Sequence, residues 1–193
     1  VEFDNVSFAY DEKNFVLNDI SFQIKAGDTL AIVGSTGSGK SSIINTLNRF
    51  YEIQKGKILV DDIDVKKIKL NSLRSKVAMV LQDVFLFNGS VLNNITLRDP
   101  SISREEVISA SKIIGAHPFI ESMPGGYDFK VTERGSNLSM GQRQLISFVR
   151  ALVVNPNILI LDEATSSIDT ETETIIQYAI EKLIEKRTSI IIA

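Results

Sequence analysis

Two hydrophobic patterns divide the chain. Four short runs of apolar residues are bounded by turn-forming residues, at 29–33, 77–81, 158–161 and 189–193. Such continuous runs are typical of strands in a parallel sheet that is covered on both faces. Near the N-terminus polar and apolar residues alternate instead, over 1–8 and 16–24. This alternation predicts a half-exposed antiparallel sheet, which residues 57–61 can join.

Helical spacing dominates between about Asn88 and Pro156. Residues 104–115 carry apolar side chains at helical intervals, and Ser103 is a suitable N-cap for them. The same spacing returns at 145–152, in a helix that stops before Pro156 because proline disfavours helical backbone at the preceding residue. A third helix is expected over 171–185.

Together these patterns predict an α/β fold with an inserted helical part. We expect a parallel-sheet core formed by residues 1–87 and 157–193, with an antiparallel β-subdomain at its N-terminal end. The inserted α-helical subdomain is expected to comprise residues 88–156.

The composition is that of an ordinary globular domain. Of the 193 residues, 44% are hydrophobic and 23% are charged, and the formal net charge of −3 gives no general attraction to nucleic acid. No cysteine is present, which excludes disulfides and thiolate chemistry. The apolar runs are far shorter than the roughly 18–20 residues that span a bilayer.

A phosphate-binding loop is the most specific motif. The stretch GSTGSGKSS matches G-x-x-x-x-G-K-[ST] and lies between an expected strand and an expected helix over 41–50. Its glycines let the backbone turn N–H groups toward phosphate oxygens, and the helix N-terminus adds its positive end. Lys40 can reach the β- and γ-phosphates as a catalytic charge, and the Ser41 hydroxyl can bind Mg²⁺. The sequence therefore predicts a phosphate-loop NTPase core that binds a nucleoside triphosphate. The loop residues assigned to the nucleotide are Gly34, Ser35, Thr36, Gly37, Ser38, Gly39, Lys40, Ser41 and Ser42.

Two carboxylates follow the strand expected at 158–161. Because ligands collect at the carboxyl edge of a parallel sheet, Asp162 is interpreted as the Mg²⁺ carboxylate of a phosphate-loop enzyme. Glu163 is then well placed to polarise the attacking water as general base. Gln82 follows the strand at 77–81, and its amide is assigned to the metal, the water or both. An ordinary turn residue is an equal alternative for this glutamine.

A second helix start suited to an anion lies about a hundred residues after the loop. Ser139 and Gln142 have the S-x-x-Q form of a capping box, which predicts a helix that begins at Ser139. By itself the box can simply cap a helix, and that alternative stays open. One phosphate loop needs no second anion-binding helix in the same monomer, whereas a second copy of the chain, turned head to tail, could use it.

In their order and spacing these motifs resemble the ATP-binding cassette (ABC) family. LSMGQRQ at 138–144 is similar to the family's signature L-S-G-G-Q, and ILILDE and SSID follow it as they do in that family. The stretch Glu133-Arg134-Gly135 resembles the X-loop of ABC exporters, and VSFAY resembles the start of their nucleotide-binding domain. The resemblance covers all 193 residues. Met140 replaces the first glycine of the signature, and we expect helical backbone there because methionine is a good helix former.

The resemblance implies two domains that are arranged head to tail and enclose two ATP molecules, and each ATP is bound with Mg²⁺. The phosphate loop of one copy and the signature helix of the other then hold each ATP. Ser139 and Gly141 are implied to contact the γ-phosphate, and Gln142 is assigned to the nucleotide as well. Tyr10 takes the position of the aromatic residue that stacks on adenine, and Asp169 belongs to the D-loop at the dimer seam. The implied function is that of the ATPase domain of an exporter.

The resemblance also implies partners. These are a second nucleotide-binding domain, identical or paralogous, and transmembrane domains at the cytoplasmic face of a membrane, without nucleic acid. Coupling helices of the membrane part are implied near Gln82 and residues 83–95, where Phe85 and Phe87 either contact them or belong to the core. The family's switch histidine would follow Ala193, so the sequence as given is expected to bind MgATP but to hydrolyse it poorly.

Two other functions stay open. One is a soluble ABC-class ATPase that acts on DNA or ribosomes, although the long coiled-coil insertions typical of that class are not seen in the sequence. The other is a regulatory cassette that binds ATP without turnover, against which Glu163 argues.

Overall fold

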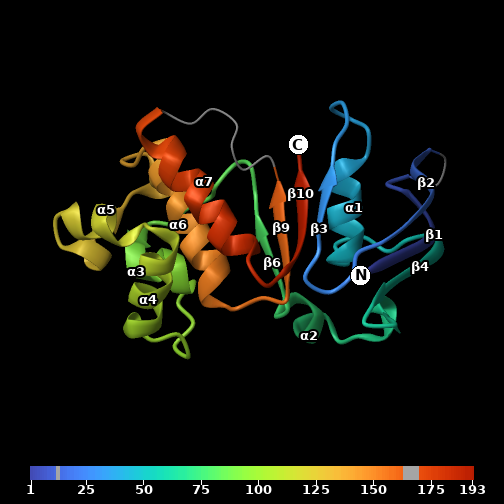
Figure 1. Ribbon diagram of the computed structural model, residues 1–193, viewed down its shortest axis with the longest axis horizontal. Helices are drawn as coiled ribbons and strands as arrows, with labels where there is room; N and C mark the ends of the chain where they lie inside the picture. The colour runs from blue at the N-terminus through green and yellow to red at the C-terminus, as the bar shows by residue number, and fades with distance from the viewer. Residues whose placement is uncertain (12–13, 163–169) are drawn as a thin grey trace. The chain divides into compact units, whose positions relative to one another are not determined.

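The computed structural model describes residues 1–11, 14–162 and 170–193, and the chain divides into two compact units (Figure 1). The first unit comprises Val1–Ala78, Asn157–Asp162 and Lys186–Ala193. The second comprises Met79–Pro156 and helix α7 (Thr170–Ile184). The second unit is larger than the helical subdomain expected at 88–156. It begins at Met79, and it includes α7, which packs on helices of the inserted segment.

The N-terminal strands of the first unit form an antiparallel sheet, as expected. Its order is β2-β1-β4-β5, with β1 (Glu2–Ala9), β2 (Phe15–Gln23), β4 (Lys55–Val60) and β5 (Ile63–Asp64). Phe3, Val6 and Phe8 on β1 are buried, so this strand supplies part of the core. Strict alternation fails around Asn5 and Asp19, which have left-handed backbone (φ 48° and 54°) where the register of β1 and β2 is irregular. Irregular register of this kind bends a strand and re-aims its side chains.

A parallel sheet in the order β3-β10-β9-β6 confirms the four strands expected from the apolar runs. Its strands are β3 (Thr29–Ile32), β6 (Val77–Val80), β9 (Ile158–Asp162) and β10 (Thr188–Ile192). Strand β10 lies between β3 and β9 and is parallel to both. The central strands β9 and β10 are almost entirely buried, as their continuous apolar sequences predict. The edge strand β3 is partly exposed, so coverage on both faces does not extend to it.

Helix α1 (Lys40–Leu47) follows β3 and packs on β2 (Figure 1). The helix expected over 41–50 is corrected at both ends, since it begins at Lys40 and stops after Leu47. Arg49 has left-handed backbone (φ 51°), which a right-handed helix cannot continue. Its guanidinium donates to the carbonyl oxygens of Val65 and Ile68, each at 2.9 Å. These bonds fix the turn against two short helices that the hydrophobic pattern does not predict, η1 (Val65–Lys67) and α2 (Leu70–Arg74).

Helix α6 (Met140–Val153) lies at the centre of the second unit. It packs on α3 (Val91–Thr96), α4 (Arg104–Ile114) and α7 (Figure 1). Leu145, Phe148 and Val149 of α6 are fully buried, which confirms the expected helical spacing. The unit also contains β7 (Gly89–Ser90), β8 (Lys130–Val131), α5 (His117–Ser122), η2 (Gly126–Asp128) and η3 (Glu133–Gly135).

The N-cap expected for α4 is confirmed. The Ser103 hydroxyl oxygen accepts a hydrogen bond from the Glu106 amide at 3.2 Å, and the Glu106 carboxylate accepts one from the Ser103 amide at 2.7 Å. The two residues form a capping box, which satisfies two backbone N–H groups at the start of the helix. The last helical residue is Ile114, one residue before the end expected from the sequence, and Gly115 follows it as the C-cap in left-handed conformation (φ 80°).

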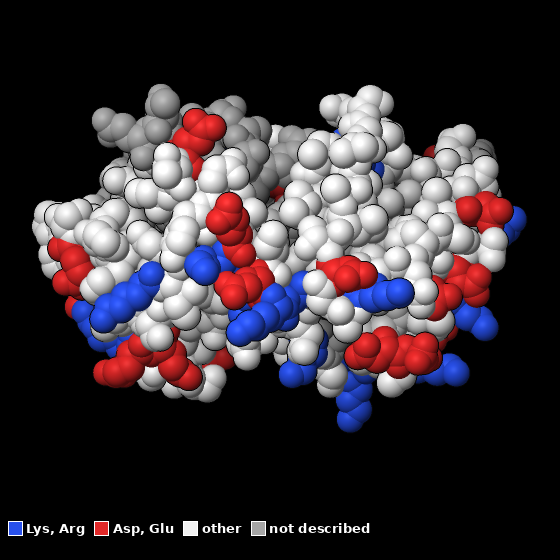
Figure 2. All heavy atoms as spheres, viewed as in Figure 1, with Lys and Arg blue, Asp and Glu red and all other residues white. Residues whose placement is uncertain are grey.

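Within the described ranges, no helix combines the length and hydrophobicity that crossing a bilayer requires. On the face shown in Figure 2, acidic and basic side chains are interspersed, and neither sign forms a continuous field there.

Arg150 links α6 to two other segments of the second unit. Its Nε donates to the Asn94 carbonyl oxygen at 2.8 Å, and both Nη atoms lie 3.3 Å from the Phe85 carbonyl oxygen. Burial lowers the pKa of the guanidinium from its usual value, but arginine stays charged in proteins at any physiological pH. The charged Arg150 side chain therefore connects α6 with α3 and with the segment that follows β6.

We expect Arg150→Met to lower the free energy of unfolding by about 1–3 kcal/mol, because the partly buried Asn94 carbonyl group and the exposed Phe85 carbonyl group lose a charged donor. Arg143→Met is the matched control on the same helix, since the Arg143 side chain makes no hydrogen bond within the described part of the chain. It should change the free energy by less than about 0.5 kcal/mol. Urea denaturation followed by circular dichroism measures both, and equal midpoints for the two variants would contradict the role of Arg150.

Candidate nucleotide-binding site

Residues 34–42 connect β3 to α1, as the loop motif predicts. Gly39, directly before the first helical residue, has left-handed backbone (φ 95°). A side chain at this position would come to 3.1 Å from the Val16 carbonyl oxygen and from Leu17 Cδ2. Glycine suits both the conformation and the close approach to β2, so the local packing accounts for this residue.

The start of α1 is suited to an anion. Gly39 offers no side chain that could cap the first N–H groups of the helix, and no acidic residue lies in the first turn. Lys40 adds a full positive charge, and its Nζ donates to the carbonyl oxygens of Gly34 at 2.5 Å and of Ser35 at 3.4 Å. The loop therefore collects N–H donors, the positive end of the helix dipole and an ammonium group in one place.

The hydroxyl residues of the loop differ in exposure. Ser41, in the first turn of α1, is exposed, whereas Ser42 is buried with 4% of its surface accessible. The other hydroxyl side chains of the loop are exposed, namely Ser35, Thr36 and Ser38. The exposed Ser41 hydroxyl can therefore bind a ligand, whereas the Ser42 hydroxyl contacts the Tyr10 hydroxyl.

Tyr10 lies beside the start of α1 although 32 residues separate it from Ser42 in sequence. Its hydroxyl is 3.1 Å from Ser42 Oγ and accepts a hydrogen bond from Asn45 Nδ2 at 3.2 Å. The side chain is 52% exposed. The fold thus brings the aromatic ring that the resemblance assigns to adenine next to a residue of the phosphate loop.

Asp162 ends β9 at the edge of the sheet from which the loop emerges. Ile192 on β10 pairs with Ile32 on one side and with Asp162 on the other, so β3 and β9 end at the same level. Two strand spacings, about 10 Å, separate these ends. The carboxylate assigned to the metal and the phosphate loop therefore follow the same edge of one sheet. Glu163, the next residue in sequence, and Asp169 lie outside the described residues.

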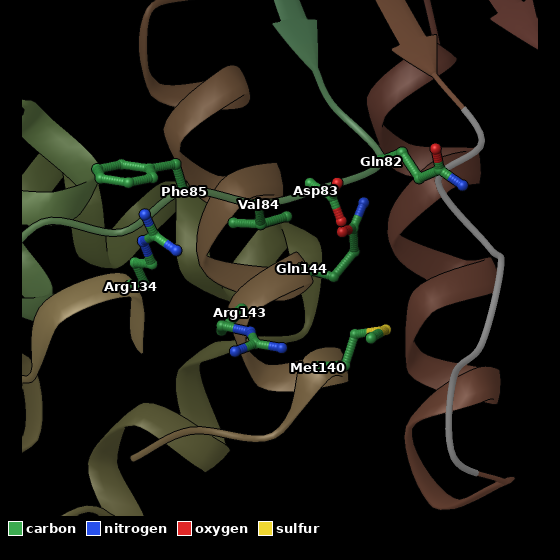
Figure 3. Close-up of a pocket in the computed structure, with 8 residues that line it drawn as sticks. All are labelled: Gln82, Asp83, Val84, Phe85, Arg134, Met140, Arg143 and Gln144. Carbon is green, nitrogen blue, oxygen red and sulfur yellow. The ribbon is translucent and has the colours of Figure 1, made fainter. Parts of the chain in front are cut away.

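Gln82 follows β6 in the second unit, at the edge of a pocket of about 350 Å³ (Figure 3). The pocket is lined by Gln82, Asp83, Val84, Phe85, Arg134, Met140, Arg143 and Gln144. In Figure 3 the Gln82 side chain points away from Phe85, whereas those of Asp83 and Gln144 point toward each other. The contact of Gln82 with a metal or a water stays a prediction.

Phe85 and Phe87 are exposed over 48% and 54% of their surface, so the alternative that they belong to the core is wrong. Their rings pack edge to face with centroids 5.0 Å apart. The backbone beneath them is fixed, because Asn94 accepts from the Phe87 amide at 2.8 Å and donates to the Phe87 carbonyl at 2.9 Å. Arg134 also holds this segment, since its amide donates to the Leu86 carbonyl oxygen at 3.0 Å.

Ser139 is the N-cap of α6, as the capping-box motif predicts. Its Oγ accepts from the Gln142 amide at 3.2 Å, and Gln142 Oε1 accepts from the Ser139 amide at 3.0 Å. Because Ser139 acts only as an acceptor in the cap, its hydroxyl hydrogen can still be donated to another group. The side chain is exposed. The cap alone accounts for both residues, and their contact with a nucleotide stays a prediction.

Gly141 marks a close approach of α6 to α7. A side chain at this position would overlap Thr172, whose Cβ would be only 2.8 Å away. Packing within the second unit is thus a sufficient reason for this glycine, and its contact with a nucleotide also stays a prediction. Met140 beside it lies in the helix without a positive φ, so the expectation of helical backbone there is confirmed.

Two residues of the site region were missed from the sequence. Asn45 binds the Tyr10 hydroxyl, and the Tyr51 ring packs on Tyr10 with centroids 4.9 Å apart. The only sequence signal for Tyr51 is the aromatic pair Phe50-Tyr51 after α1, in a segment that is otherwise largely polar. A pair of this kind does not show which other aromatic residue it meets.

Comparison with known proteins agrees with this geometry. The profile of the ABC transporter family matches residues 17–166. The whole chain is 52% identical to YknV, an ABC transporter ATP-binding protein of Bacillus subtilis, and covers 32% of it. It is 49% identical to the ATP-dependent lipid A-core flippase of Haemophilus influenzae, of which it covers 33%.

A solved structure extends the agreement to three dimensions. A bacterial Atm1-family ABC exporter with ATP bound matches the whole chain with a TM-score of 0.91 and 43% identity. The chain spans about a third of the length of each of these three proteins. With the phosphate loop, the sheet edge and the capped signature helix in the positions described, the chain belongs to the ABC transporter family.

Proposed function

We propose that the chain is the ATP-binding and ATP-hydrolysing domain of an exporter. The observation that carries the proposal is the loop at 34–42, where the uncapped start of α1 and the Lys40 ammonium converge. The similar proteins include a flippase and an exporter, which favours transport over action on nucleic acid or ribosomes. The domain would then work at the cytoplasmic face of a membrane, where ATP is present.

Mg²⁺ suits the residues at the sheet edge. This ion prefers oxygen ligands and is usually held by one or two protein oxygens together with phosphates and water. Among the described residues no group of three or more acidic, histidine or cysteine side chains could hold a metal by itself. We assign Ser41, Asp162 and Gln82 to the ion, whose charge offsets that of the phosphate oxygens when it is bound.

Hydrolysis transfers the γ-phosphoryl group of ATP to water, with ADP as the leaving group. In our proposal the Lys40 ammonium stabilises the negative charge on the β- and γ-phosphate oxygens. Glu163 accepts a proton from the attacking water, and Gln82 helps to orient that water. Tyr10 stacks on the adenine, for which its half-exposed side chain leaves room.

A second nucleotide-binding domain completes the site in this proposal. Ser139 supports it, because its side chain is exposed and its hydroxyl hydrogen is available for a phosphate of the opposite domain. The first turn of α6 contains no acidic residue that would repel an anion. ADP lacks the γ-phosphate, so hydrolysis removes the contact with Ser139 and lowers the affinity of the two domains for each other.

The membrane part is assigned to the surface around Phe85 and Phe87. These two exposed rings stand on a backbone that Asn94, Arg134 and Arg150 hold in place. Exposed aromatic side chains on a fixed backbone are suited to bind a partner. We propose that helices of the transmembrane domains contact the rings, so that movement of this surface reaches α6 through Arg150.

We expect Glu163→Gln to lower ATP turnover by about 10²–10⁴-fold while ATP binding persists, because the variant lacks the general base. Glu173→Gln, an exposed acid on α7, is the control for loss of one negative charge and should leave turnover unchanged. Phosphate release and equilibrium ATP binding are measured on the full-length protein. Loss of ATP binding by Glu163→Gln would show that the role assigned to this residue is wrong.

We expect MgATP to raise the dimer fraction of the Glu163→Gln cassette, because trapped ATP bridges the two copies. Adding Ser139→Arg should abolish this increase, since a long cationic side chain would fill the space of the γ-phosphate contact. Ser122→Arg adds the same charge at an exposed position on α5 and should leave the increase intact. Sedimentation velocity with and without MgATP measures the fractions. A Ser139→Arg variant that still dimerises would rule out the bridge.

A further inference from the structure

The Tyr10 ring is held by two other aromatic rings. The Phe8 ring lies nearly perpendicular to it (79°), with ring centroids 4.7 Å apart. The Tyr51 ring is also perpendicular to the Tyr10 ring (89°), with centroids 4.9 Å apart. Phe8 and Tyr51 also contact each other at 5.8 Å. Phe8 is buried on β1, whereas Tyr51 is 47% exposed and follows α1. The three rings form a cluster in which Tyr10 is supported from both the sheet and the segment after the helix.

The hydroxyl end of Tyr10 is fixed by a second set of contacts. The Asn45 side-chain amide can only donate through Nδ2, so the Tyr10 oxygen accepts at 3.2 Å. Its own hydrogen is then available for Ser42 Oγ at 3.1 Å. Ring contacts and hydroxyl contacts together leave the Tyr10 side chain little freedom to rotate, although about half of its surface is exposed.

We propose that Tyr51 is a positioning residue that fixes the Tyr10 ring for stacking on the base of the nucleotide. The inference rests on the proposed function, because it takes Tyr10 as the adenine platform. A ring that is already fixed loses less conformational freedom when a ligand binds, which raises affinity without a new contact. The effect is confined to the base. The phosphate end relies on Lys40 and the start of α1, and Tyr51 makes none of the ring or hydrogen-bond contacts found there.

A comparison of two ligands separates positioning from general damage. MgADP contains the base, and magnesium pyrophosphate offers only the phosphate end. Neither carries the γ-phosphate of ATP, so the proposed reaction consumes neither. We expect Tyr51→Leu to weaken MgADP binding by about 3- to 10-fold, the equivalent of one lost aromatic pair. Pyrophosphate binding should not change. Tyr51→Phe keeps the ring pair and should bind both ligands as the unchanged protein does.

Phe50→Leu is the matched control. Phe50 is adjacent to Tyr51 and similarly exposed (48%), but its ring packs on the Arg74 guanidinium at 5.0 Å and not on Tyr10. Its loss should leave the affinities for both ligands unchanged. Titration calorimetry on the full-length protein measures MgADP directly and pyrophosphate by displacement.

Each result decides the proposal. A selective loss of MgADP affinity in Tyr51→Leu, absent from Tyr51→Phe and Phe50→Leu, supports it. Equal weakening of both ligands, or no weakening, overturns it and leaves the proposed ATPase function in place. If the unchanged protein bound neither ligand, the proposed function would fail together with this inference. If it bound pyrophosphate as tightly as MgADP, Tyr10 would not be a base platform.

Discussion

The arrangement of the site depends on a short stretch of backbone pairing in the parallel sheet. Ile192 on β10 pairs with Ile32 on β3 and with Asp162 on β9, so two chain segments far apart in sequence end at one level. Backbone hydrogen bonds between the strands set the spacing between the strand that precedes the loop and the strand that ends at the carboxylate. The buried side chains of Leu159, Ile160 and Ile190 hold these strands together, so the chemistry at the edge rests on an apolar core.

The packing of the second unit keeps the start of α6 exposed and in a fixed orientation. The apolar side of α6 is buried among α3, α4 and α7, and Gly141 lets the first turn approach Thr172 closely. Arg150 near the other end of α6 binds the backbone that carries Phe85. The polar start of the helix and the exposed aromatic pair are therefore parts of one packed body. Because close-packed interiors transmit strain, a displacement of one end of α6 would also shift the other end.

Local patterns predicted much of this fold. Continuous apolar runs identified the central strands because burial on both faces requires such sequences. An N-cap serine identified the start of α4, and a capping box identified that of α6, because both are local hydrogen-bond patterns. The end of α1 was predicted wrongly because Arg49 takes a left-handed conformation, and its bonds to Val65 and Ile68 depend on tertiary structure. Tyr51 was missed for the same reason. The contact between the Tyr51 and Tyr10 rings depends on how α1 packs on the sheet, and residue spacing in the sequence does not predict this packing.

The reciprocal bonds between Ser139 and Gln142 have a consequence for how two domains would come together. They satisfy backbone donors of the first turn within the same chain, so this turn does not need a ligand to become ordered. Its conformational entropy is lost when the chain folds and not when the partner arrives. Closure around a nucleotide would then resemble the docking of two rigid bodies. Its speed would be set by how often they meet in the right orientation rather than by a slow local rearrangement.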